Sequence, residues 1–143
     1  MAPPLPWVRL HDPSPDREYV FLASYLPLKR LGQVPRFMRY SQSIRGQLQR
    51  TEGAIGYSLR AKILRRDFWT LSVWESEEAL RQFVRADPHG GVMRSLVPHM
   101  GPTKFVRWKA QGSEVPPSWD EADRRMSAEE GEKVSGRGAR RSS

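Results

Sequence analysis

The fold is decided by the stretch at residues 66–84, which reads Arg66-Asp67-Phe68-Trp69-Thr70-Leu71-Ser72-Val73-Trp74-Glu75-Ser76-Glu77-Glu78-Ala79-Leu80-Arg81-Gln82-Phe83-Val84. Its first half predicts a strand, because aromatic and β-branched residues are dense there. Apolar side chains fall on both faces, which is typical of a central strand covered on both sides. From Ser76 onward the pattern changes to a helix cap, an acidic first turn and apolar residues at helical spacing. The stretch therefore predicts a strand that passes directly into an amphipathic helix.

The segments on either side of this stretch extend the pattern to the order β-α-β-β-α-β. A first strand is predicted over about residues 17–28, a helix over 34–50, a second strand over 54–64 and a last strand over 103–109. A short extra helix, which Asp87 can cap, precedes the last strand, and another begins after Ser118. This order predicts an α+β, ferredoxin-like fold with an antiparallel sheet and helices on one face.

The other face of the predicted sheet also needs cover. Alternation places four bulky rings on it that cannot all stay in water: Phe21, Tyr25, Phe68 and Trp74. A facing sheet from a second copy of the chain is the simplest cover, and two-fold pairing is the commonest assembly. The sequence therefore predicts a homodimer that pairs sheet against sheet.

The composition divides the chain of 143 residues into four segments. Residues 17–110 are expected to form the packed domain. Residues 1–16 form a proline-rich, partly ordered lead, in which Trp7 can anchor to the domain. Residues 111–126 form an extension with a short helix, where Trp119 is a second anchor. Residues 127–143 are predicted to be a disordered tail, because they bury too little apolar surface to offset the entropy of ordering.

The formal net charge of +8 fits a nucleic acid, a membrane surface or an anionic small molecule as partner, and equally a basic solvated surface. A nucleic-acid module is disfavoured, because the strands lack the interleaved glycine pattern of ferredoxin-like RNA binders. The chain has no cysteine, which excludes disulfides, a thiolate nucleophile and a zinc ribbon. No signal peptide and no apolar run of about 18 residues is seen. A cytoplasmic protein without a membrane partner is expected.

The segment at residues 68–80 resembles the strand-to-helix signature of the dimeric α+β barrel superfamily, best known through antibiotic biosynthesis monooxygenases. The later Asp87-Pro88-His89 also resembles this group, which often has a histidine near the break after this helix. The resemblance covers about residues 17–110. It implies a homodimer with a pocket between helices and sheet in each subunit, and it leaves the reaction open, because one fold serves many functions.

Members of this superfamily include cofactor-free oxygenases of phenolic polyketides, heme-degrading enzymes, heme-binding dehydratases and proteins with no known activity. The heme-degrading branch uses an asparagine, a tryptophan and a histidine, and this chain has no asparagine; Ser24 stands about where it is expected. That departure argues against heme degradation and leaves heme binding open, with His89 or His99 as axial ligand.

His89 is the first catalytic candidate, because an imidazole at the mouth of a pocket can move protons near neutral pH or bind a metal. A helix-terminal histidine that only contacts backbone or solvent is the plainer alternative. Tyr25 and Tyr40 are further catalytic candidates, because their hydroxyls can hydrogen-bond a phenolate or quinone. Trp69 and Trp74 can stack on a flat ring, although core packing is their more ordinary role. The remaining predicted substrate contacts are Phe83, Met93, Ser24 and Arg39, with Arg45 as another cation on the same helix.

The resemblance, taken with these residues, implies a small monooxygenase-like enzyme of secondary, antibiotic metabolism that acts on an aromatic or polycyclic molecule without a cofactor. The substrate anion can itself give an electron to dioxygen, so the protein needs only orientation, a dry cavity and control of protons. No GxGxxG, P-loop, HExxH or GxSxG motif points elsewhere. A heme protein, a non-oxidative cyclase or isomerase, and a non-catalytic binding protein are the alternatives.

Overall fold

A five-stranded antiparallel sheet forms the centre of the structure, a computed structural model that describes residues 6–135, with side chains described up to residue 128. The strands are arranged in the order β1-β3-β4-β2-β5. They span Val8–Arg9 (β1), Glu18–Pro27 (β2), Ala54–Lys62 (β3), Asp67–Trp74 (β4) and Lys104–Gln111 (β5). The predicted α+β, ferredoxin-like class with an antiparallel sheet is confirmed.

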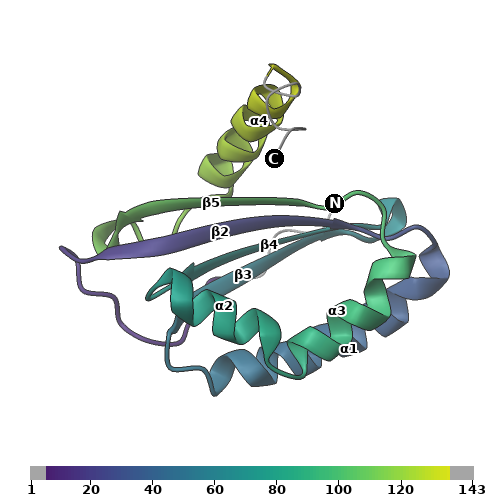
Figure 1. Cartoon of the computed structure of the whole chain (residues 1–143), viewed down its shortest axis with the longest axis horizontal. Helices are drawn as coiled ribbons and strands as arrows, with labels where there is room; N and C mark the ends of the chain where they lie inside the picture. Colours follow the sequence, from purple (N-terminus) through teal and green to yellow (C-terminus); the bar gives the residue numbers. More distant parts are fainter. Residues whose placement is uncertain (1–5, 136–143) are drawn as a thin grey trace.

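Three helices cover one face of the sheet (Figure 1): α1 (Val34–Gln49), α2 (Glu77–Arg85) and α3 (His89–Leu96). Short 3-10 turns join the elements at Leu31–Gln33, Ile63–Arg65, Val97–His99 and Gly112–Glu114. None of the helices within residues 6–135 is long and apolar enough to cross a bilayer.

The decisive stretch forms the elements that its sequence predicts. Strand β4 lies between β3 and β2, so it is an interior strand with both faces covered. The helix α2 follows at once, and the hydroxyl of Ser76 accepts a hydrogen bond from the backbone N–H of Ala79 at 3.1 Å. The cap satisfies one of the free donors of the first turn, which fixes the start of α2.

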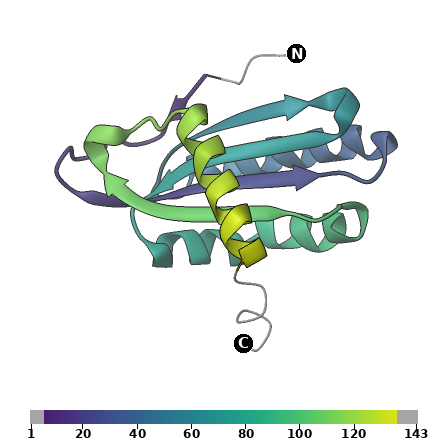
Figure 2. The ribbon, with the colours of Figure 1, turned by 90° about the horizontal axis from the view of Figure 1, so that it is seen from above.

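A fourth helix, α4 (Trp119–Ser135), crosses the opposite face of the sheet (Figure 2). Its residues Ala122 and Met126 are buried in a cluster with Phe21, Leu71 and other side chains of that face. The sequence predicts only a short helix here and disorder from residue 127, whereas the helix continues to Ser135. Residues 136–143 of the predicted tail and residues 1–5 of the predicted lead lie outside the described residues.

The side chain of Arg60 on β3 holds α4 to the sheet. Its guanidinium lies 4.5 Å from the ring centre of Trp69 and 4.5 Å from that of Trp119, and it donates two hydrogen bonds to the carboxylate of Asp123, at 3.0 and 2.8 Å. A bidentate ion pair between two indoles is stronger than a solvated surface pair. Trp119 is thus seated where an anchor is predicted.

The face assignment of two predicted rings is wrong. Phe68 and Trp74 point toward the helices: Phe68 contacts Phe37 at 4.3 Å between ring centres, and Trp74 contacts Phe83 at 4.9 Å. Phe21 does lie on the opposite face, where α4 of the same chain helps to bury it. The need for cover, which was the reason to expect sheet-to-sheet pairing, is therefore met largely within one chain. The homodimer itself stays a prediction.

Replacing Gly56 by alanine is expected to destabilise the fold by about 1–3 kcal/mol, since it overfills a packed site. An added Cβ at this position lies 2.5 Å from the indole of Trp7, which rests on β3. Urea unfolding of Gly56→Ala and of the control Gly32→Ala checks this, because a Cβ at Gly32 meets nothing within 4 Å. Equal stability of the two variants means that Trp7 is not seated on the sheet.

Candidate functional site

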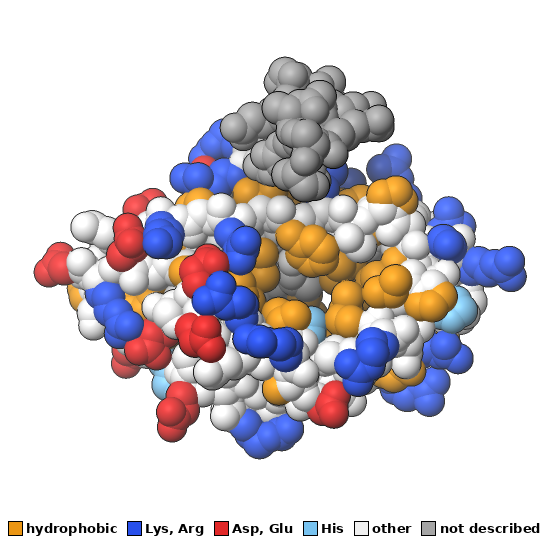
Figure 3. Space-filling view, viewed as in Figure 1, with side chains coloured by type: hydrophobic (Ala, Val, Ile, Leu, Met, Phe, Trp, Pro, Cys, Tyr) orange, Lys and Arg blue, Asp and Glu red, His pale blue; other side chains and the backbone are white. Residues whose placement is uncertain are grey.

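A cavity of about 730 Å³ lies between the sheet and the helices α1, α2 and α3. Figure 3 shows hydrophobic side chains gathered in a hollow between β5 and the helices below it. Ligand pockets of this size and apolar character commonly hold one small organic molecule. The apolar walls include Leu22, Leu26, Phe37, Ile44, Leu59, Phe68, Trp74, Phe83, Val92 and Met93.

His89 contributes an imidazole to this cavity from the first residue of α3. Its Nδ1 lies 3.0 Å from the carbonyl oxygen of Val84, and since a carbonyl can only accept, Nδ1 carries the proton. The neutral ring then keeps a lone pair on Nε2. Burial lowers the pKa of His89 from 6.5, and the hydrogen bond to Val84 opposes this in part. The imidazole is therefore neutral, and able to accept a proton, at neutral pH.

Gln47 on α1 fixes the chain segment that carries His89. Its side chain is buried, with 6% exposed, and its Oε1 accepts a hydrogen bond from the backbone N–H of His89 at 2.9 Å. Its Nε2 donates to the carbonyl of Phe83 at 3.2 Å and approaches that of Ala86 at 3.5 Å. One amide thus ties α1 to the end of α2 and the start of α3. Pro88, and not the predicted Asp87, occupies the N-cap position of α3, and the carboxylate of Asp87 accepts a hydrogen bond from the N–H of Gly91 at 3.1 Å.

Replacing Gln47 by methionine is expected to cost about 1–3 kcal/mol of stability, because it leaves buried backbone groups without partners. The variant should also weaken binding of a phenol such as 2-naphthol, since His89 loses its support. Chemical unfolding and calorimetric titration measure the two effects. Gln49→Met on the exposed side of α1 is the matched control. Wild-type stability in Gln47→Met contradicts the assigned hydrogen bonds.

Hydroxyl groups interrupt the apolar face of the sheet above the cavity. Ser24 on β2 and Thr70 on β4 are directly paired in the sheet, and both line the cavity. The third, Ser72, accepts a hydrogen bond from the indole N–H of Trp74 at 2.8 Å. The sheet side of the cavity therefore carries one serine, Ser72, that already accepts a hydrogen bond, and beside it the hydroxyl pair Ser24 and Thr70.

Six of the predicted site residues come together around the cavity. They are His89, Tyr40, Trp74, Phe83, Met93 and Ser24. They come from β2, α1, β4, α2 and α3, so the fold brings together positions that are far apart in the sequence. Trp74 and Phe83 also pack against each other, so the core role weighed for Trp74 holds in addition to its place in the wall.

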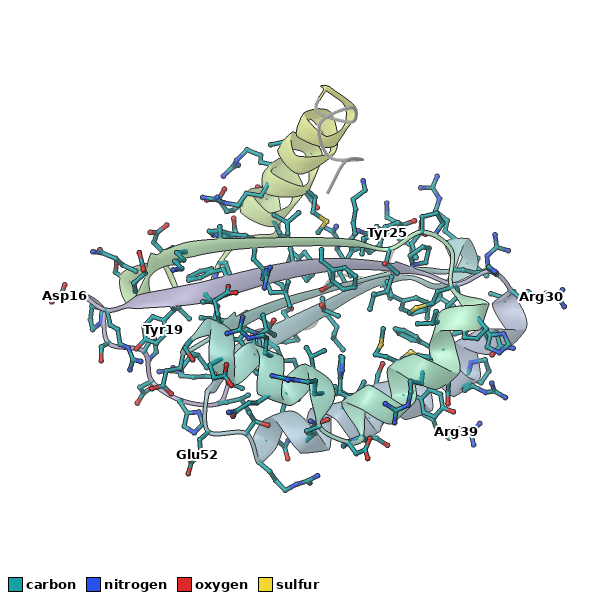
Figure 4. The ribbon with its side chains drawn as sticks, viewed as in Figure 1. Asp16, Tyr19, Tyr25, Arg30, Arg39 and Glu52 are labelled. Carbon is teal, nitrogen blue, oxygen red and sulfur yellow. The ribbon has the colours of Figure 1, made fainter. Side chains whose placement is uncertain are left out.

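Tyr25 does not belong to the cavity. Its side chain lies on the α4 side of the sheet, where its hydroxyl donates a hydrogen bond to the carboxylate of Asp67 at 2.7 Å (Figure 4). Burial, followed by the hydrogen bond and the negative charge of Asp67, raises the pKa of Tyr25 to about 12. Alternation along β2 explains the placement, because Ser24 occupies the cavity side and its neighbour must face away.

Three other predicted residues are placed differently from expectation. The indole of Trp69 packs on the α4 side against Tyr25 and Arg60, although its position in β4 borders the cavity. Arg39 is exposed on the outer side of α1 (Figure 4). His99 lines a separate surface cavity of about 370 Å³ with Lys29, Arg30, Gln33 and Pro98.

Sequence reasoning missed two cations at the cavity, or weighed them too lightly. The Nε of Arg45 donates to the hydroxyl of Tyr57 at 3.1 Å, and Arg107 on β5 pairs with Glu77 at 3.0 Å. Arg45 follows Arg39 at a spacing of six residues, and only the observed helix register shows which of the two turns inward. The only sequence feature that indicates a place for Arg107 at the cavity is the alternation of β5, which puts it on the same face as the exposed ring of Phe105.

Comparison with protein-family models assigns the chain to a family. Residues 31–134 match the model of a family described as a domain of unknown function, DUF3291. The chain belongs to the DUF3291 family. The matched range begins before α1 and ends within α4, so α4 is part of the DUF3291 domain. No curated protein matches this DUF3291 chain.

Solved structures share the fold of this DUF3291 protein at low sequence identity. A conserved protein from Methanosarcina mazei is 18% identical with a TM-score of 0.57, over 63% of this chain and 90% of that chain. An antibiotic biosynthesis monooxygenase is 11% identical with a TM-score of 0.58, over 64% and 97%. A protein from Nitrosomonas europaea, provisionally named as such a monooxygenase, is 11% identical with a TM-score of 0.56, over 62% and 95%. The predicted fold of the antibiotic biosynthesis monooxygenase group is confirmed.

Proposed function

We propose that this DUF3291 protein binds a flat, mostly apolar molecule with a weakly acidic group in the cavity and catalyses its oxidation by dioxygen. The observation that carries the proposal is the state of His89. One ring nitrogen is fixed to the carbonyl of Val84, and the other makes no hydrogen bond within the described residues, while His89 lines a largely apolar cavity. A positioned neutral imidazole is suited to remove a proton from a weak acid.

The proposed reaction converts a ring CH₂ group, flanked by aromatic rings, into a carbonyl with release of water. Nε2 of His89 takes one proton from this carbon, and the resulting anion passes an electron to dioxygen. Recombination forms a carbon-bound peroxide anion, and the first proton returns to it from His89 to give the hydroperoxide. The second C–H bond and the O–O bond then break, so that one oxygen stays as the carbonyl and the other leaves as water. His89 takes the proton of the second C–H bond and passes it to the departing hydroxide. The electron pair of that C–H bond forms the carbonyl π bond as the O–O bond breaks, so the substrate supplies both electrons that the second oxygen needs.

The walls of the cavity support the other requirements of such a reaction. Aromatic rings at Phe37, Phe68, Trp74 and Phe83 offer flat surfaces for a ring system. Their apolar character keeps water from a reactive anion. The monooxygenase names carried by proteins of the same fold are consistent with this chemistry.

Oxidation of anthrone to anthraquinone is the direct test, followed with an oxygen electrode and by quinone absorbance. We expect saturable oxygen uptake of one dioxygen per anthrone, above the spontaneous rate without protein. Uptake no faster than the spontaneous rate contradicts the oxidation. If anthrone still binds in that case, the chain is a binding protein or a catalyst of a non-oxidative step.

Heme is the second candidate ligand, because histidines that bind metals usually donate their other ring N–H to a carbonyl, as His89 does. The cavity residues fit a single protein ligand, His89, and the heme carboxylates would have to compete with Tyr57 for Arg45 and with Glu77 for Arg107. Bound heme supplies one-electron and oxygen chemistry. A Soret band that forms when heme is added to wild type and to His99→Ala, but not to His89→Ala, favours this candidate. Its absence favours the cofactor-free reaction.

A further inference from the structure

The hydroxyl of Ser24 lines the cavity and has no protein partner among the described residues. The residue is only 4% exposed, and its side chain makes no hydrogen bond within the described part of the chain. A hydroxyl without a protein partner is left to bind water or a ligand, and it can both donate and accept. Ser24 faces the cavity, where a ligand can supply the missing partner.

Thr70 places a second hydroxyl beside that of Ser24. The two residues are opposite each other on antiparallel strands, and side chains at such positions have Cβ atoms about 4.5–5.5 Å apart. Thr70 also makes no side-chain hydrogen bond in the described residues, and both line the cavity. Two hydroxyls at this spacing can both contact one oxygen atom, and each can donate or accept.

The other hydroxyl groups on the sheet side of the cavity already accept hydrogen bonds from protein side chains. Ser72 accepts from Trp74, and the hydroxyl of Tyr57 accepts from Arg45. Ser41 on α1 also lines the cavity, but it is only partly buried and can reach water. Ser24 and Thr70 are therefore the cavity-lining residues of the sheet whose hydroxyls make no side-chain hydrogen bond within the described part of the chain.

We propose that Ser24 and Thr70 form a hydroxyl subsite that binds a second oxygen of the ligand. His89 lies on the helix side of the cavity and the hydroxyl pair on the sheet side, so a ligand between them is held at two points. The cavity then selects aromatic molecules with two separated oxygen substituents, one toward His89 and a hydroxyl or carbonyl toward the sheet. This inference rests on the proposed binding of an acidic aromatic molecule beside His89.

Matched probes separate the two contacts. Calorimetric titration compares 2-naphthol with the 1,5-, 2,6- and 2,7-dihydroxynaphthalenes, which share its ring system and add one oxygen at different places. At least one diol is expected to bind about 3- to 10-fold tighter than 2-naphthol, the range for one added hydrogen bond. Thr70→Val keeps the side-chain shape, Ser24→Ala removes only the oxygen, and both should abolish the advantage while 2-naphthol binds as before. Ser43→Ala, on the exposed side of α1 and outside the cavity, should keep it.

Each outcome decides between the two proposals. A diol advantage that survives in the Ser24→Ala, Thr70→Val double variant overturns the subsite, as does the lack of any diol advantage in wild type. In both cases binding of 2-naphthol that is lost in His89→Ala leaves the proposed function standing. If no probe binds to the wild-type protein, the subsite and the proposed function both fail.

Discussion

His89→Gln is expected to lower the rate of anthrone oxidation by about 10²- to 10⁴-fold, the usual contribution of a positioned general base. Glutamine keeps a polar side chain of similar reach but cannot take a proton. Thermal unfolding should show that the variant is folded. Tyr25→Phe and Arg39→Gln are controls with unchanged rates, because Tyr25 lies on the α4 side of the sheet and Arg39 is exposed outside the cavity. A His89→Gln rate equal to that of wild type removes His89 from the reaction.

The same variant changes the pH dependence. Burial holds the pKa of His89 below 6.5, so the wild-type rate should be constant around pH 7 and fall only on the acid side, with a midpoint below pH 6.5. Stability follows the same direction, because the unfolded state takes up this proton first as pH falls through 6.5. In His89→Gln the acid limb of the rate should disappear. A midpoint above pH 6.5 contradicts the buried, neutral imidazole.

Ala122→Arg is expected to lower the free energy of unfolding by about 3 kcal/mol or more, since it places an unpaired charge against a buried apolar cluster. Ala122 is fully buried where α4 crosses Phe21, Leu71 and Val73. Ala128→Arg on the exposed part of the same helix is the matched control, with a change within about 0.5 kcal/mol. Urea unfolding measures both.

Equal stabilities of these two variants mean that α4 does not cover the sheet. Sedimentation of the wild-type chain then shows whether a second copy of the chain covers this face instead. A homodimer that pairs sheet against sheet would use the face of the sheet that α4 crosses. If a dimer forms in Ala122→Arg but not in the wild-type protein, α4 blocks such pairing. A wild-type dimer that persists with α4 in place uses another surface.

The order and bounds of the central elements could be predicted from local patterns. Strand β4 and helix α2 carry an aromatic, alternating run followed by a capped helical run, and each signal lies within a few residues. The choice of sheet face could not be predicted, because both faces of β4 are apolar and alternation does not say which one the helices cover. The sequence pattern therefore assigns Phe68 and Trp74 to the same face as Phe21 and Tyr25. Only Phe21 and Tyr25 lie on that face, which α4 crosses.

A local irregularity misled the pattern in β3. Alternation predicts that Ile55 and Tyr57 share a face, but the register shifts between Ala54 and Gly56, and Ile55 instead joins the cluster under α4. A β-bulge of this kind inserts one residue and reverses the alternation on one side of it. Gly56, a glycine inside the strand, is the sequence signal that could have indicated this bulge.

The candidate site was predicted where a residue type itself carries chemistry, and missed where its role depends on a distant partner. His89 stands out as a histidine beside a helix break. Gln47 is an ordinary helix residue until α2 and α3 place three backbone groups around its amide. Thr70 likewise gains meaning only from its pairing with Ser24 across the sheet.

The most direct test of the account is nitrogen-15 NMR of the His89 ring with and without 2-naphthol, assigned with His89→Gln. The account predicts a neutral ring with the proton on Nδ1, a pKa below 6.5, and a change at Nε2 but not at Nδ1 when 2-naphthol is added. A proton on Nε2, a pKa at or above 6.5, or an Nε2 signal that does not respond to 2-naphthol contradicts it.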